Sequence, residues 1–549
     1  MEYAPLTPGN RPGGCRKDGR LSSFKEYQMS RFHSTVSRRE FLKNVGLAGG
    51  VGATAALAAP GFHDLDEVAA AKGSAPKRSW WIKEKDEPTV DVDWDLMARH
   101  HGFHSTQSDI IQARYYGLEE WKAMTMPSAT DRMKAGEPGY SLRDYALANG
   151  ANRENSAYGK WEDTFRGANT PAFIGPQRAK TPEQLGVPKW EGTPEENTKM
   201  LRAAMKLYGA QDIGVSKLDD HHKKLVGTHG DNISYSYYPP KFNVPTTVTK
   251  PMVFADVPTG YVDSATGTFY IPNKDMWEVT FTIPMPKELA RTAHSQLFGA
   301  ANNCRYRMTT VIRPNTQEFL RGLGYQGLAD NPYRGVPSEA GAVFSGLAEN
   351  SRHTIMAINP EHGSWTGFFH ILTDLPLEET KPIDAGIWRF CHSCGTCAKY
   401  CPSNSIEPKG GREISYDPYP SAVTPKDPPL PGLGWDKPTP GESEYFKLGR
   451  KTYWTDMISC AGYRKSVDAC LRCFGSCVFN SADDAMIHDL VRSTSAVTPL
   501  FNSFFAEMHE VFGLGLKNDE EKEEWWDMSL PSHGYSTAVT SRHGGYNKG

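Results

Sequence analysis

The cysteines of this 549-residue chain gather late in the sequence, and their spacing indicates metal chemistry. Eight of the ten lie between Cys391 and Cys477, in two runs. The first run has gaps of two, two and three residues and ends in Cys401-Pro402, a spacing typical of bacterial ferredoxins. Such short gaps let the chain wrap one iron–sulfur cubane, and soft thiolate sulfur is the ligand that suits it. The sequence therefore predicts two [4Fe–4S] clusters and a protein that handles electrons.

Two clusters need eight thiolates, and swapped ligation decides how the two runs share them. In two-cluster ferredoxins the fourth cysteine of a run binds the other cluster. The first cluster is then expected to take Cys391, Cys394, Cys397 and Cys477, and the second Cys401, Cys460, Cys470 and Cys473. The second run departs from the ferredoxin pattern, because Val478 follows its last cysteine and a long gap precedes Cys470, but the ligand count is intact. Cys15 and Cys304 lie outside the runs and are interpreted as incidental.

Disulfides and structural zinc are the alternatives for these cysteines. An exported chain can form disulfides, but disulfide pairing would not need two nearly identical spacings. Zinc binds Cys-x-x-Cys pairs in sets of four ligands and rarely uses a four-cysteine run closed by proline. The iron–sulfur interpretation is therefore preferred.

The amino-terminal segment has the form of an export signal. Ser37–Lys43 (SRREFLK) is a twin-arginine motif, and the apolar stretch Val45–Ala59 is too short and too glycine-rich for a stable membrane span. The twin-arginine (Tat) route carries proteins that have folded around their cofactors, which agrees with iron–sulfur clusters. We expect cleavage after Ala58 or Ala71, with Met29 as an alternative start. Because no later segment is long and apolar enough to span a bilayer, we expect a partner to attach the protein to the outer face of the cytoplasmic membrane.

Composition bounds the class of protein. The formal net charge is −3 and no basic stretch follows the signal, which argues against nucleic acid as a partner. Aromatic residues make up 11% of the chain, enough to line an apolar pocket, although they also fill ordinary cores. The expected order is a leader over 1–71, a wrapping region over 72–190, a catalytic domain over 191–384, a cluster domain over 385–490 and a tail over 491–549.

Hydrophobic patterning predicts an α+β centre that must position the reactive groups. Thr193 and Glu196 have the spacing of a capping box, and the helix that they begin is expected to end at Gly209. Strands are expected at 213–218, 252–257, 277–283 and 370–375. A short helix is expected after Pro286, and another over 305–322 that Pro314 interrupts. The apolar face of the first helix is expected to consist of Met200, Leu201, Ala204, Leu207 and Tyr208.

Taken together, the sequence resembles the respiratory reductive dehalogenases over nearly its whole length. These are exported catalytic subunits that use a corrinoid and two [4Fe–4S] clusters to remove halogen from organohalides. The order of a twin-arginine leader, a central domain and two late cysteine runs is more specific than any one motif. The segments that carry the resemblance are Ser37–Phe41, Lys189–Asn197, Leu323–Tyr325, Leu372–Pro376, Lys381–Gly386 and both cysteine runs.

The resemblance implies a fold and a catalytic site. Family members fold the centre as a nitroreductase-like α+β domain around a base-off corrinoid, followed by a ferredoxin-type module. Their catalytic tyrosine lies nineteen residues before the tyrosine of the Leu-Gly-Tyr motif, which makes it Tyr306 here, and an asparagine after that motif corresponds to Asn331. Tyr306 would deliver a proton to the carbon that loses halide. Phe298, Trp365 and Phe368 are expected either to line the substrate pocket or to pack in the core.

This chain departs from the family pattern at one position. Family members carry an arginine or lysine shortly before Thr-Asp-Leu that stabilises the phenolate, but Trp365–Phe369 contains neither. The candidates to replace that cation are His362, His370 and Arg307. The Asp-x-His-x-x-Gly motif, which binds cobalamin through histidine, is also missing, since no glycine follows Asp219–His222 at the required place. Its absence agrees with a base-off corrinoid.

The resemblance also implies partners and leaves alternatives open. The expected partners are an organohalide substrate, a small integral-membrane anchor protein and an upstream chain of membrane electron donors. The alternatives are an epoxyqueuosine-reductase-like tRNA-modifying enzyme, a non-catalytic iron–sulfur electron-transfer subunit, and an inactive scaffold of the same family. The leader argues against the first, and the long region before the cysteine runs argues against the second.

Overall fold

The computed structural model describes residues 78–99, 129–151, 171–228, 251–329, 338–410, 449–467, 470–480 and 486–527. The chain divides into two compact units, Met1–Pro60 and Gly61–Gly549, and all described residues belong to the second. The predicted export signal and Asn331 lie outside the described residues. Helices and strands alternate along the described chain, which confirms mixed α and β content.

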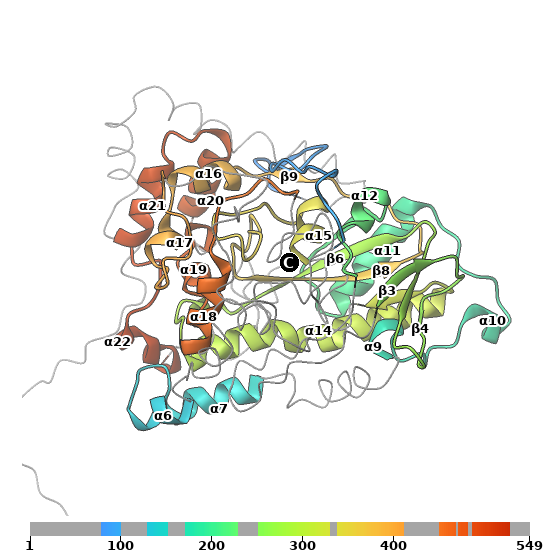
Figure 1. Cartoon of the computed structure of the whole chain (residues 1–549), viewed down its shortest axis with the longest axis horizontal. Coiled ribbons are helices and arrows are strands. Elements are labelled where there is room, and N and C mark those ends of the chain that lie inside the picture. Colours follow the sequence, from blue (N-terminus) through green and yellow to red (C-terminus); the bar gives the residue numbers. More distant parts are fainter. Residues whose placement is uncertain are drawn as a thin grey trace, which may run out of the picture. The chain divides into compact units, whose positions relative to one another are not determined.

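A four-stranded antiparallel sheet forms the centre (Figure 1). Its strand order is β2-β6-β8-β7, with bounds Ile213–Lys217, Trp277–Pro284, Thr366–Thr373 and Gly327–Ala329. Alternate residues of β6, namely Val279, Phe281 and Ile283, are buried in one core cluster with side chains of the neighbouring helices, because successive side chains of a strand point to opposite faces. The strands predicted at 213–218 and 277–283 are confirmed, whereas the one predicted at 370–375 begins earlier, at Thr366.

Helix α11 (Pro194–Leu207) begins as the sequence predicts. The Thr193 hydroxyl accepts from the backbone N–H of Glu196, and the Glu196 carboxylate accepts from the backbone N–H of Thr193. Gly209 follows the helix with a φ of 112°, a left-handed conformation that favours glycine. The expected apolar face is wrong in one member, since Leu207 is 83% exposed while Met205, four residues after Leu201, is buried.

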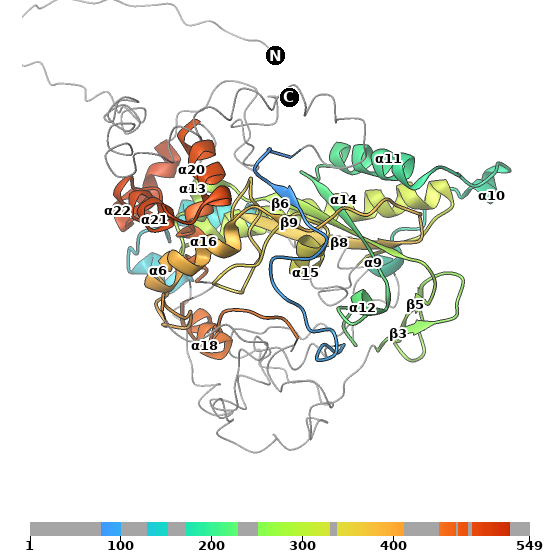
Figure 2. The same ribbon diagram turned by 90° about the horizontal axis from the view of Figure 1, so that it is seen from above.

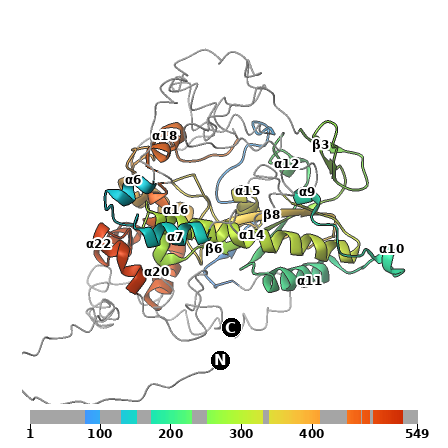
Figure 3. The same cartoon turned by 90° about the horizontal axis from the view of Figure 1, so that it is seen from below.

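Helix α14 (Gln296–Leu323) differs from the prediction because Pro314 does not interrupt it. The helix runs for 28 residues, and the short helix α13 (Lys287–Ala290) precedes it. Proline removes one hydrogen bond from the helical ladder, but Thr310, Ile312 and Thr316 on both sides of it are buried, so tertiary packing holds the helix together. Helix α7 (Leu142–Ala151) lies along it (Figure 3).

The remaining elements surround this centre. Strand β3 (Met252–Ala255) pairs with β5 (Phe269–Pro272) in parallel, and β4 (Tyr261–Val262) completes a three-stranded sheet at one side of the unit (Figure 2). Strands β1 (Lys83–Glu84) and β9 (Ile383–Asp384) form an antiparallel pair. The other helices around the centre are α6 (Ala129–Lys134), α9 (Pro171–Ile174), α10 (Pro182–Leu185), α12 (Asp220–Lys223) and α15 (Ser338–Phe344).

The carboxyl-terminal helices gather at the other end of the sheet, around the cysteine runs (Figure 1). One apolar cluster joins the two regions, because Phe298, Trp365 and Phe368 pack in it together with Cys397 and Cys473. None of the helices in the described ranges is long and apolar enough to cross a bilayer. The carboxyl-terminal helices are α16 (Ile387–Ser393), α17 (Thr396–Lys399), α18 (Met457–Val467), α19 (Arg472–Gly475), α20 (Met486–Val497), α21 (Asn502–Val511) and α22 (Asp519–Lys522). Short 3₁₀ turns cover Val478–Asn480 and Glu523–Asp527.

Truncation of the central strand tests this core. Phe281 is fully buried between the sheet and α14, so Phe281→Ala is expected to lower the free energy of unfolding by about 3–5 kcal/mol. Leu207→Ala, at the exposed position of α11, is the matched control and is expected to change it by less than about 0.5 kcal/mol. Thermal and urea unfolding of the two variants beside the parent measure both effects. Equal losses would contradict the assignment of the core.

Candidate functional site

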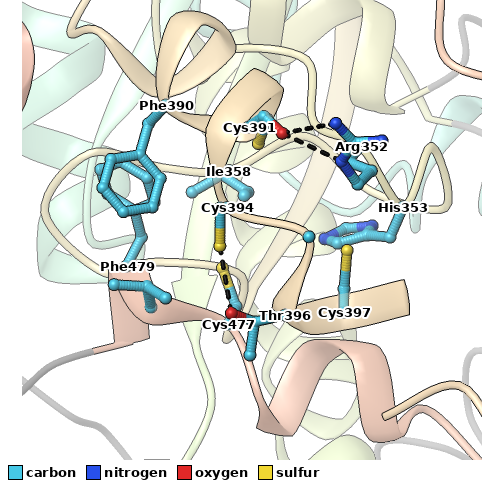
Figure 4. A pocket seen from close by; sticks show the side chains of 12 residues that line it. Arg352, His353, Ile358, Phe390, Cys391, Cys394, Thr396, Cys397, Cys477 and Phe479 are labelled. Atoms are coloured by element: carbon cyan, nitrogen blue, oxygen red, sulfur yellow. Dashed lines mark hydrogen bonds between the residues drawn. The ribbon is translucent and has the colours of Figure 1, made fainter. Parts of the chain in front are cut away.

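Four cysteines from the two runs line one cavity (Figure 4). They are Cys391, Cys394, Cys397 and Cys477. Helix α16 carries the first and α17 the third, whereas Cys477 comes from the second run and directly follows α19 and Ser476. The structure thus brings together the four cysteines that swapped ligation assigns to the first cluster. The other side chains of the cavity wall include Arg352, His353, Ile358, Phe390 and Phe479.

The other four cysteines also lie near one another. Burial raises the pKa of the Cys460 thiol to about 12; the nearby Arg464 opposes that rise, and the thiols of Cys470 and Cys401 add to it. Burial places the pKa of Cys473 well above its usual range, and its thiol interacts with those of Cys460, Cys470 and Cys401. Cys473 also interacts with Cys397, so the two groups are neighbours.

Buried thiols of this kind suit a multinuclear metal centre. Burial raises the pKa of Cys391 far above its usual range and that of Cys477 to about 12, so the thiolates form only where cations offset their charge. Polar donors lie beside the sulfurs: the Thr396 hydroxyl is 3.2 Å from Cys394 Sγ, and the backbone N–H of Ser405 donates to Cys401 Sγ at 3.3 Å. Such donors tune iron–sulfur centres. Within the described ranges, no three His, Cys, Asp or Glu side chains are grouped so as to hold a single metal ion.

A loop over 349–358 fixes helix α16 at both ends. The Glu349 carboxylate accepts from the backbone N–H groups of Ala385 and Ile387 at 2.7 and 3.1 Å, just before and at the start of α16. Arg352 donates to the carbonyl of Cys391 at 2.8 and 2.9 Å and to that of Glu407 at 3.0 Å. Sequence patterns gave no signal for either role, because both contacts join segments that are distant in the chain.

Tyr306 lies on α14, half-buried, with its ring edge against Phe369 of β8 at 5.8 Å. The buried Arg305 donates from Nη2 to the Tyr306 hydroxyl at 3.3 Å, and its guanidinium lies 4.9 Å from the centre of the tyrosine ring. Asn302 accepts from Nε of the same arginine at 3.0 Å. The structure therefore brings a cation to the predicted proton donor.

The candidates that the sequence suggested for this cation take other places. Arg307 donates to Cys304 Sγ at 3.7 Å. His370 follows Phe369 in β8, and because side chains alternate along a strand, it points to the face of the sheet away from Tyr306. His362 lies in a turn, where its backbone N–H donates to Asn359 Oδ1.

Arg305 was missed because adjacent residues of a helix normally point apart. Its long side chain turns toward Tyr306 over Gly367 of β8, where a Cβ atom would lie 2.8 Å from Arg305 Cδ. The glycine in Trp365–Phe369 therefore leaves room for the Arg305 side chain.

Buried polar atoms near the start of β8 suit a large polar cofactor. Trp365 Nε1 and Thr366 Oγ1 are buried and have no hydrogen-bond partner among the described residues. Burying such groups without a partner costs about 1–3 kcal/mol each. A corrinoid, whose rim carries amide side chains, offers both donors and acceptors to them, so the residues present fit this group.

The family model of the reductive dehalogenase subunit matches residues 77–377, which is more than half of the chain. The chain therefore belongs to the reductive dehalogenase subunit family. A reductive dehalogenase is an oxidoreductase, so the enzyme class that the sequence predicted is confirmed.

Two relatives and one set of solved structures describe the likeness further. The chain is 30% identical to a trichloroethene reductive dehalogenase of Dehalococcoides mccartyi, over 93% of this chain and 99% of the relative. It is 29% identical to a chloroethene reductive dehalogenase of Dehalococcoides mccartyi strain VS, over 92% and 99%. The solved catabolic reductive dehalogenase NpRdhA has the same fold, with a TM-score of 0.51 at 17% identity over 85% of this chain. The match spans about half of the length of that solved chain.

An epoxyqueuosine reductase of Lactococcus garvieae is similar over a smaller part. It is 30% identical across 21% of this chain and 34% of its own length. The extent of the two dehalogenase matches favours the dehalogenase over this alternative.

The buried Glu349 predicts a pH-dependent contribution to stability. Burial raises its pKa from 4.5 to about 7, so the carboxyl contributes most below pH 4.5 and loses that contribution as the pH rises through about 7. The stability of the parent relative to Glu349→Gln is expected to fall by up to about 3 kcal/mol between pH 5 and pH 8. Unfolding midpoints of both proteins across this range measure the difference. A difference that stays constant with pH would contradict a raised pKa at this carboxyl.

Proposed function

We propose that the chain is the catalytic subunit of a reductive dehalogenase for small chlorinated hydrocarbons, chlorinated ethenes first among them. The relatives named for trichloroethene and chloroethene, each matched over nearly its whole length, support this substrate class. The observation that carries the redox assignment is the cavity lined by four cysteines from two distant runs. The proposed cofactors are two [4Fe–4S] clusters and a base-off corrinoid. One of the solved structures with this fold is described as suggesting a mechanism for B12-dependent dehalogenation, which supports the corrinoid.

The chemistry sets what the residues must do. Replacing halogen by hydrogen consumes two electrons and one proton and releases halide. A bound corrinoid supplies the low-valent cobalt that cleaves the carbon–halogen bond, and the clusters supply electrons one at a time. The eight cysteines would hold the clusters, and the buried polar groups at the start of β8 would bind the corrinoid rim. The protein's remaining task is to deliver the proton.

Tyr306 is the proposed proton donor. A phenol is a weak acid near neutral pH and gives up its proton more readily where a cation stabilises the phenolate. Arg305 donates to the hydroxyl and is itself held by Asn302, so it takes the place of the basic residue missing from Trp365–Phe369. Tyr306 packs against the apolar cluster that contains Phe281 and Phe369, which limits the entry of water that would compete for protonation. Asn331, outside the described residues, remains the second proposed catalytic residue.

Several finer features belong to the same proposal. The centre would be a nitroreductase-like domain and the cysteine region a ferredoxin-type module, with the borders predicted from the sequence. The twin-arginine leader supports export to the outer face of the cytoplasmic membrane. A small integral-membrane anchor and a membrane chain of electron donors would be the partners.

Metal analysis tests the cofactors. Purified parent protein is expected to contain about eight iron atoms per chain and one cobalt. Cys477→Ser is expected to lose about half of the iron and most of the electron transfer, because it removes one ligand of the first cluster. Cys304→Ser, buried outside both groups, is the control and is expected to keep all metals. Zinc in place of iron, or no cobalt after reconstitution with cobalamin, would reject the proposal.

Chloride release from chlorinated ethenes with reduced viologen tests the proton donor. Tyr306→Phe is expected to lower kcat by about 10²–10⁴-fold at unchanged metal content, because the reacting carbon loses its acid. Arg305→Met is expected to have a smaller effect in the same direction, because the phenolate loses the cation that stabilises it. Tyr325→Phe, whose hydroxyl donates to the Trp190 carbonyl, is the control. Full turnover by Tyr306→Phe would remove this residue from the mechanism.

A further inference from the structure

His353 occupies an unexpected place for a polar side chain. It lies in the loop over 349–358, is 1% exposed and lines the cavity of Cys391, Cys394, Cys397 and Cys477. Figure 4 shows its ring among the side chains of the cavity wall, which include Cys397. A residue at this place touches whatever occupies the cavity.

Neither ring nitrogen of His353 has a hydrogen-bond partner among the described residues. A neutral imidazole carries one N–H donor and one acceptor, and leaving a buried donor unsatisfied costs about 1–3 kcal/mol. The ring packs against Phe474 at 5.1 Å, a contact that a phenylalanine in place of His353 would also make. Packing therefore does not account for the imidazole, whereas an acceptor inside the cavity does.

The neighbouring Arg352 and His392 side chains do not direct a donor into the cavity. The donors of Arg352 are directed to the carbonyls of Cys391 and Glu407, with its guanidinium over the Tyr453 ring at 4.3 Å. His392 packs on Trp388 and Tyr453 and is not part of the cavity wall. These bonds of Arg352 also anchor the loop next to His353, so the imidazole is held in place before any cofactor binds.

Its position also relates the two cysteine groups. Phe474 directly follows Cys473, a member of the second group, and packs in the same apolar cluster as Cys397 of the first. The imidazole therefore lies between the first cavity and the chain that carries the second group. A hydrogen bond from the imidazole would therefore act on the first cluster, at the side that faces the second cluster.

We propose that His353 donates an N–H hydrogen bond to a sulfur of the [4Fe–4S] cluster bound by Cys391, Cys394, Cys397 and Cys477, and so raises the reduction potential of that cluster. The inference rests on the proposed cofactors. Adding an electron makes a cluster more negative, and a donor directed at its sulfur stabilises the reduced form more than the oxidised form. His353 then makes this cluster easier to reduce than its cysteines alone would, without affecting the other directly.

The test is a redox titration of the full-length holoprotein, followed by electron paramagnetic resonance. His353→Phe keeps the contact with Phe474 and removes the donor. At a fixed potential it is expected to lower the ratio of reduced to oxidised first cluster about tenfold, which is 59 mV for one electron. The second cluster is expected to keep its potential. His353→Gln, which keeps an N–H donor, is expected to restore most of the shift, and His392→Phe is the matched control with no effect.

A second measurement does not depend on a variant that assembles. In parent protein labelled with ¹⁵N-histidine, pulsed resonance on the reduced cluster is expected to show coupling to one imidazole nitrogen. An unshifted potential in His353→Phe with both clusters present, or no such coupling, would overturn this inference and leave the proposed function standing. Parent protein without any [4Fe–4S] signal would instead reject the proposed cofactors, and the inference with them.

Discussion

The cysteine region depends on one constraint: its thiols are buried in apolar surroundings, and the proposed clusters require them as thiolates. Burial raises the pKa values of Cys391, Cys397 and Cys473 far above the usual range, so these sulfurs are of use as ligands only where cations lie among them. The same burial excludes water and strengthens the electrostatic interaction of nearby dipoles with the sulfurs. The donors at Thr396 and Ser405, and the proposed donor at His353, follow from this need.

The cysteine region and the sheet share one interior. Trp365 and Phe368 at the start of β8 pack in the same apolar cluster as Cys397 and Cys473. The Glu349 loop connects the two regions a second time, because its carboxylate holds the start of α16 while Arg352 holds its end. The proposed passage of electrons toward the sheet would therefore cross packed side chains of one shared interior.

At the sheet, the proposed proton donor Tyr306 has a cation beside it that comes from its own helix. Trp365–Phe369 contains no Arg or Lys, and the space over Gly367 is taken by the Arg305 side chain, which reaches the Tyr306 hydroxyl. The contact with Phe369 on the other side of Tyr306 fixes the ring. The proposed proton donor therefore has its cation from the adjacent position of the same helix.

Local features were readable from the sequence alone. The cysteine spacing predicted which sulfurs meet, and the capping box at Thr193 and the alternation along β6 predicted elements that the structure contains, because each depends only on the geometry of a short stretch of chain. Pro314 and Leu207 misled the prediction, since packing from distant segments outweighs local preference at the first and the helix face turns outward at the second. The contact of Arg305 with Tyr306, the carboxylate of Glu349 at α16 and the place of His353 in the cavity wall were decided only by the tertiary structure. Each joins or orients side chains through the packing of separate elements, and that arrangement has no periodic trace in the sequence.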